Sequence, residues 1–215
     1  MENFNIVFGT TELFREGGPF MYVILVIGVL VLGIALERIW VIGRASGFDS
    51  GRFLRDIEAR LTQGDVPGAL NLARQAQTPV AHVAATVIAS DRTNDDRMMT
   101  AAEGAASTVL PPLSRRLPFL AVLANTATLL GLLGTIFGLT TAFSAVGAAD
   151  PAQRSTFLAL GISQALNTTS LGLIIAIPTL LLHTFLVGRV ETVIDQVEET
   201  SARVIQAMGR AGRAA

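Results

Sequence analysis

The chain has 215 residues, of which 51% are hydrophobic and only 15% are charged. A soluble domain carries about 25% charged residues, so this shortfall points to a lipid environment. The net charge of −1 indicates no polyanion-binding surface. The absence of cysteine excludes disulfides, thiolate metal sites and cysteine nucleophiles.

Three long stretches contain no Asp, Glu, Lys or Arg: residues 17–36, 117–149 and 155–188. A helix needs about 20 apolar residues to cross a bilayer core of about 30 Å, so each stretch predicts a transmembrane helix. The second and third are longer than this, and we expect both helices to extend past the membrane on its cytoplasmic side. We do not expect the first to be a cleaved signal peptide, because it lacks a basic leading region and a small-residue cleavage site.

These stretches divide the chain into seven segments and predict an all-α integral membrane protein. We expect a periplasmic amphipathic segment or irregular cap at 1–18, transmembrane helices at 19–42, 117–147 and 157–188, a helical cytoplasmic insert at 43–116, a periplasmic turn at 148–156 and a cytoplasmic helical tail at 189–215. The orientation follows from the arginines, because fourteen of the sixteen lie on the side of the insert and tail. The positive-inside rule places that side in the cytoplasm.

Helix start and stop signals divide the insert. One predicted helix precedes Asp65. Asp65 is the predicted cap of the second, which has Pro67 in its first turn, Pro79 begins the third, and a fourth begins near Asp96. Pro111 and Pro112 are expected to bend or interrupt that fourth helix before the second span.

The tail is expected to continue the third span as a helix. Its apolar positions alternate steps of four and three, as in a short heptad seam: Val190, Ile194, Val197, Ser201, Val204 and Met208. The seam fits two arrangements, packing against the insert of the same chain or bundling with other copies around an oligomer axis.

Polar and small residues interrupt the second and third spans. The candidate lumen-lining residues are Thr128, Thr135, Gln164, Thr168 and Thr169, and the candidate helix-packing residues are Gly131, Gly134, Gly138, Gly172 and Pro178. Small residues let membrane helices approach closely, and hydroxyls bond across helices or to their own carbonyls. Packing alone is therefore one interpretation of all ten, whereas Thr135 and the dense cluster at 164–170 also suit a polar path.

Neither long span contains a carboxylate or an arginine. A proton path through a membrane normally needs a titratable group at depth, so the acid of any such path must come from another polypeptide. His183, near the inner end of the third span, is either an interfacial anchor or a relay, and His82 lies in the insert. We find no enzyme motif and predict no enzymatic activity, cofactor or metal site.

Three motifs carry a resemblance to a known family. Residues 130–139, LGLLGTIFGL, resemble the second-span signature GLxGTVxGI of the MotA/TolQ/ExbB proton channel family. Residues 161–178, GISQALNTTSLGLIIAIP, resemble its third-span signature GIxEALxxTxxGLxxAIP, with Gln164 at the position of the family's glutamate. Residues 35–40, ALERIW, are similar to its first-span ending ALERxW. The TolQ/ExbB branch fits better than MotA, which has four spans.

The resemblance implies an inner-membrane stator subunit of a motor driven by the proton-motive force. It implies five copies around two copies of a single-span partner of the ExbD/TolR type, which supplies a membrane aspartate. Thr135 and Thr169 would then line the lumen and hydrogen-bond to that aspartate. Such an assembly passes energy to an envelope process such as biopolymer transport.

Two other classes of function stay open at this point. A non-conducting membrane scaffold would use the polar residues only to pack helices. A small transporter would have its own substrate site, although the second and third spans show no internal repeat. The sequence does not identify the machine that is driven, and only the resemblance favours protons over sodium ions.

Overall fold

Helices account for all regular structure in the described residues, which are 17–90 and 94–214 of this computed structural model. The predicted segment at 1–18 therefore lies almost wholly outside the described residues. The longest helices are α2 (Pro19–Ser46), α8 (Leu117–Ala148) and α9 (Arg154–Ala214). The described residues include three helices long and apolar enough to cross a membrane. The predicted fold class, an all-α membrane protein, is confirmed.

Two compact units make up the chain. The first unit contains the described part of Met1–Leu36 together with Pro118–Thr184, and the second contains Glu37–Leu117 and Phe185–Ala215. Helices α2 and α9 contribute residues to both units.

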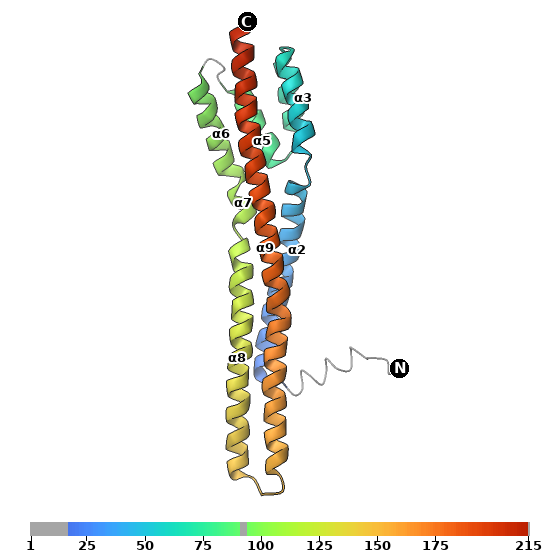
Figure 1. Cartoon of the computed structure of the whole chain (residues 1–215), viewed down its shortest axis with the longest axis vertical. Helices are drawn as coiled ribbons and strands as arrows, with labels where there is room; N and C mark the ends of the chain where they lie inside the picture. The colour runs from blue at the N-terminus through green and yellow to red at the C-terminus, as the bar shows by residue number, and fades with distance from the viewer. Residues whose placement is uncertain (1–16, 91–93, 215) are drawn as a thin grey trace, which may run out of the picture. The chain divides into compact units, whose positions relative to one another are not determined.

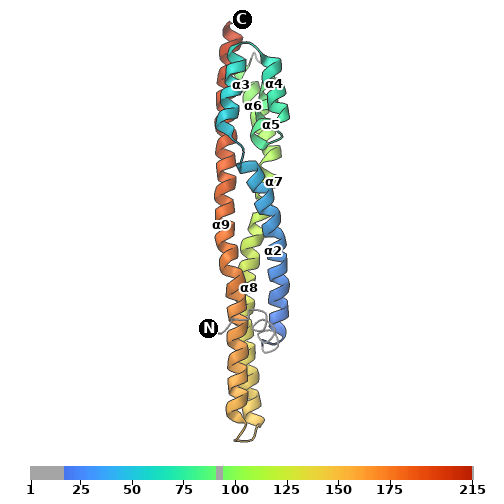
Figure 2. The same ribbon diagram turned by 90° about the vertical axis from the view of Figure 1, so that its right-hand side faces the viewer.

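Helices α2, α8 and α9 lie side by side in the first unit, as Figures 1 and 2 both show. The rings of Phe20 on α2 and Phe137 on α8 meet edge to face, with their centroids 5.3 Å apart. The outward faces are apolar and exposed, as at Leu129 and Ile174, which are 64% and 67% exposed. A soluble monomer rarely exposes such continuous apolar surface, so lipid or further protein must cover these faces.

Five short helices belong to the second unit: α3 (Ser50–Thr62), α4 (Val66–Gln75), α5 (Pro79–Ala89), α6 (Asp95–Val109) and α7 (Pro111–Ser114). Four begin at a side chain that accepts a hydrogen bond from a backbone N–H of the first turn, the usual role of an N-cap. The caps are Asp49, Asp65, Thr78 and Asn94. The predicted cap at Asp65 and the predicted helix start at Pro79 are confirmed.

The C-terminal part of α9 packs against the insert of its own chain. Figure 1 shows α3, α5 and α6 beside this red part of the helix. Val197, Val204 and Met208 belong to the same buried cluster as Ile57 and Val87. Of the two arrangements that the heptad seam predicted, packing on the insert is thus the one present within a single chain.

The proline pair interrupts the chain where the sequence predicted. Helix α6 ends at Val109, the four-residue α7 contains both prolines, and α8 begins at Leu117. Proline has no N–H and clashes with the preceding turn, which ends α6. The last carbonyls of a helix have no partner within it, and Arg38 Nη1 donates to two at the end of α7, the oxygens of Pro112 at 3.0 Å and Leu113 at 3.3 Å.

Candidate functional site

The predicted threonines of α8 hydrogen-bond within their own helix. Thr135 is half-buried, and its hydroxyl donates to the Leu132 carbonyl oxygen at 2.6 Å. Thr128, two turns away, is exposed and donates to the Ala124 carbonyl oxygen at 3.2 Å. Each hydroxyl oxygen keeps its lone pairs, so it is still able to accept a hydrogen bond from another group.

Thr169 on α9 forms a hydrogen bond between the two helices. Its hydroxyl donates to the Gly131 carbonyl oxygen of α8 at 3.1 Å. Thr168 is 1% exposed and donates to the carbonyl oxygens of Gln164 and Ala165 on its own helix. The adjacent threonines therefore differ in environment, because Thr169 joins α8 to α9 whereas Thr168 fills the space between them.

Glycines make the close approach of α8 and α9 possible. A Cβ at Gly134 would lie 2.6 Å from the Thr168 hydroxyl, and one at Gly172 would lie 2.7 Å from the Ala127 carbonyl oxygen. Gly131 and Gly138 face the α9 backbone, with Cβ positions 3.2 Å from Thr168 O and 3.1 Å from Ala165 N respectively. Small residues at such positions let membrane helices pack backbone to backbone. Pro178 lies inside α9.

Gln164 lies against the start of α2. A Cβ at Gly18 would overlap its side-chain amide nitrogen, so a larger residue would displace this amide. Gly18 also has a φ of +70°, which favours glycine. Sequence analysis did not single out Gly18, although glycine directly before Pro19 is a recognisable helix-start signal.

The α8–α9 seam thus contains Thr168, Thr169 and the four predicted glycines. Gln164 lies beside Gly18, directly before α2. Thr135 is half-buried on α8, and Thr128 is exposed on the same helix. His183 is half-buried on α9. Among residues 17–90 and 94–214, no group of three or more His, Asp or Glu side chains could hold a metal ion.

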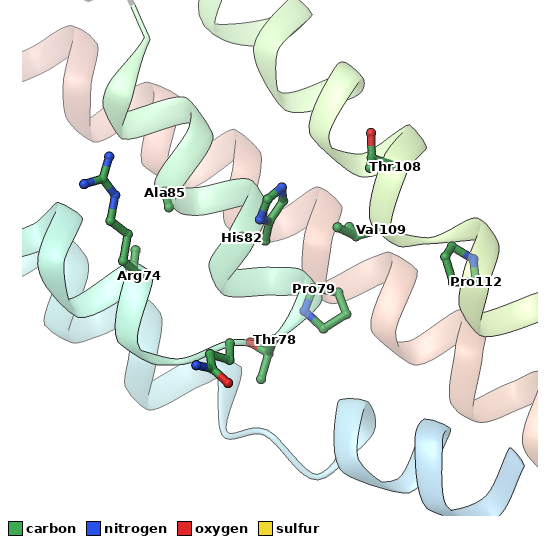
Figure 3. Close-up of a pocket in the computed structure, with 10 residues that line it drawn as sticks. Arg74, Thr78, Pro79, His82, Ala85, Thr108, Val109 and Pro112 are labelled. Atoms are coloured by element: carbon green, nitrogen blue, oxygen red, sulfur yellow. The ribbon is translucent and has the colours of Figure 1, made fainter. Parts of the chain in front are cut away.

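A cavity of about 530 Å³ lies in the second unit between α4, α5 and the end of α6 (Figure 3). The close-up shows His82 on α5, with Thr108 and Val109 on the opposite wall and Arg74 on α4. Its walls are mainly apolar or aliphatic, and His82 itself is exposed. No arrangement of nucleophile, base and orienting group is present there.

The described helices form a membrane-type unit in which the Thr169 hydroxyl joins α8 to α9 and small residues line the seam between them. The sequence profile described as the MotA/TolQ/ExbB proton channel family matches residues 72–199. The chain belongs to this family, and its role is energy transduction through a membrane proton channel.

Named relatives agree with this assignment. The chain is 32% identical over 193 residues to the ExbB homolog of Methanothermobacter thermautotrophicus, which is named for biopolymer transport, covering 89% of this chain and 68% of the relative. It is 30% identical over 164 residues to an ExbB-like protein of Synechocystis, covering 73% and 78%. It is 38% identical over 81 residues to the Tol-Pal system protein TolQ of Haemophilus influenzae, covering 38% and 35%.

Proposed function

We propose that this protein is the inner-membrane stator subunit of a motor driven by the proton-motive force. Five copies surround two copies of a single-span partner of the ExbD/TolR type, with the N-terminus in the periplasm and the C-terminus in the cytoplasm. The partner supplies a membrane aspartate that carries the proton. The assembly passes energy to an envelope process.

One observation carries the proposal, namely that the long spans combine hydroxyl groups with a complete lack of carboxylates at 117–149 and 155–188. A proton carrier at membrane depth needs a titratable group, which a second chain must then provide. An unpaired carboxylate in the membrane costs several kcal/mol, whereas its protonated form costs much less. Each protonation event therefore changes which surroundings the aspartate prefers.

Thr135 has the chemistry to serve both states of that aspartate. A hydroxyl donates to a carboxylate and accepts from a carboxylic acid, and its present acceptor is the Leu132 carbonyl oxygen. Thr169 already donates to the Gly131 carbonyl oxygen, so its lone pairs accept from the protonated acid without disturbing the helix pair. We propose Thr135 and Thr169 as lumen-lining residues, with Thr128, Gln164 and Thr168 as further members of the polar path.

The test compares Thr135→Val with Thr135→Ser in vesicles that contain the complex purified from its own membranes. We expect valine to reduce proton uptake roughly tenfold or more, the effect of losing a hydrogen bond to a charged group, and serine to keep it. The matched control is Thr140→Val, because Thr140 makes the same kind of bond on α8, to the Ile136 carbonyl oxygen at 2.7 Å.

Native mass spectrometry of the same samples tests the assembly. Five copies with two single-span partners in every variant would support the stator. An assembly without such a partner, together with unchanged proton uptake in Thr135→Val, would instead support a non-conducting scaffold. In a scaffold, the α8 hydroxyls that bond to carbonyls of their own helix would only stabilise packing.

A further inference from the structure

A basic pocket of the second unit lies where two charge-free stretches end. Glu37 and Arg38 directly follow the first stretch, and Arg115 and Arg116 directly precede the second. These four residues line one cavity of about 560 Å³, with Pro112 and Ser114 among its other walls. The first stretch has about the 20 residues that the hydrocarbon core requires, so Glu37 and Arg38 stand near the depth of the lipid phosphates. Arg116, which bonds to Glu37, lies at the same depth.

Arg38 is built into this pocket. Its side chain is only 6% exposed, and its Nη2 donates to Glu37 Oε1 at 2.9 Å while Nη1 donates to two carbonyl oxygens. Its Nε is buried without a hydrogen-bond partner among the residues that the structure describes. The three hydrogen bonds of its terminal nitrogens hold Arg38 in the pocket wall as a fixed positive charge.

The charges in the pocket do not balance. Arg116 Nη1 lies 2.6 Å from each carboxylate oxygen of Glu37, so this one carboxylate serves both Arg116 and Arg38. Arg115 is exposed, and no described residue pairs with it. Three guanidinium groups against one carboxylate leave two positive charges for an anion. Arginine forks match phosphate oxygens in geometry.

The surroundings favour a lipid over a soluble anion. Ile39 and Trp40, next along α2, are 45% and 67% exposed, and the guanidinium of Arg44 lies 6.0 Å from the Trp40 ring centroid. An exposed tryptophan beside arginines is typical of the membrane–water interface. Acyl chains therefore have an exposed apolar surface on α2 within one helical turn of Glu37.

We propose that this pocket binds the phosphate group of an anionic phospholipid, with Arg115 and Arg116 contacting the phosphate and Arg38 holding α7 against α2. The site is separate from the proposed proton path, and it requires only that the chain crosses a membrane. A free phosphate ion has the same oxygen chemistry, so the test must separate the two sources.

The single tryptophan of the chain, Trp40, follows Glu37 by three residues on α2, about one helical turn from the pocket wall, and serves as the fluorescent reporter. The full-length protein is reconstituted in phosphatidylcholine vesicles that contain a fixed fraction of either dibrominated phosphatidylglycerol or dibrominated phosphatidylcholine. Bromine quenches tryptophan fluorescence at close range. We expect stronger quenching by the brominated phosphatidylglycerol, and we expect Arg115→Gln to lower this preference about fivefold, the effect of one arginine near an anionic surface.

Arg55→Gln is the matched control, because Arg55 is an exposed arginine on α3 that does not line the pocket. It should keep the preference, and Arg115→Lys should keep part of it. Equal quenching by the two lipids, or an equal fall in Arg55→Gln and Arg115→Gln, would overturn the proposal. Release of the preference by inorganic phosphate, beyond that caused by chloride at equal ionic strength, would assign the pocket to a soluble anion and also overturn it.

Discussion

Replacing Gly172 with alanine tests whether backbone contact between α8 and α9 holds the first unit together. A Cβ at this position would lie 2.7 Å from the Ala127 carbonyl oxygen and 3.4 Å from the Gly131 Cα. The nearest atom is backbone, so no side-chain rotation relieves the overlap. The helices must separate locally by roughly 0.7 Å to reach ordinary contact, and overpacking of this kind costs about 1–3 kcal/mol.

The assay heats the detergent-solubilised protein and measures, by size-exclusion chromatography, the temperature at which half stays monodisperse. We expect Gly172→Ala to lower this temperature by several degrees. Gly188→Ala, in the same helix but with nothing within 4 Å of the added Cβ, should leave it nearly unchanged. Equal stability of Gly172→Ala and the parent protein would refute the close-packing argument, as would an equal loss in Gly188→Ala.

Three predictions concern the second unit, each measured as a change in thermal unfolding of the full-length protein. Ile57 is 0% exposed, so Ile57→Ala should cost about 2–5 kcal/mol and Ile57→Val only about 0.5–1.5 kcal/mol; equal losses would contradict the described core. Asp65→Ala should cost about 1 kcal/mol by removing the cap of α4, whereas Asp65→Asn should keep it. The Glu58 carboxylate, with a smaller contribution from Glu199, raises the pKa of Arg203. The stabilisation from these ion pairs is present below the pKa that Arg203 has in the unfolded chain and is lost only at higher pH. Arg203→Gln should therefore lower the stability by the same amount throughout about pH 6 to pH 9, and by less in high salt.

The sequence determined much of the second unit because its signals are local. Asp65 caps a helix by accepting a hydrogen bond from the N–H of Gly68, three positions away, and Pro111 with Pro112 must interrupt α6 wherever the chain goes next. Hydropathy likewise determined that three helices are able to span a membrane, because this depends only on composition and length.

Only the tertiary structure distinguished among the polar residues of the membrane unit. Thr168 and Thr169 are both candidate lumen-lining residues by sequence, yet Thr169 bonds to α8 while Thr168 is buried against Gly134. Neighbouring residues on a helix point about 100° apart, so their environments depend on where the second helix lies. The contact of Gln164 with Gly18, 146 residues apart in the sequence (164 − 18), has no local signal either.

The pairing of the charged residues likewise depended on the tertiary structure. The sequence determined that Glu37, Arg38, Arg115 and Arg116 border the charge-free stretches. The structure decided that they share one pocket, in which a single carboxylate pairs with Arg38 and Arg116. The residue types and their depth follow from composition along the chain, whereas pairing requires two segments more than seventy residues apart to meet, and only the packing of α2 against α7 brings them together.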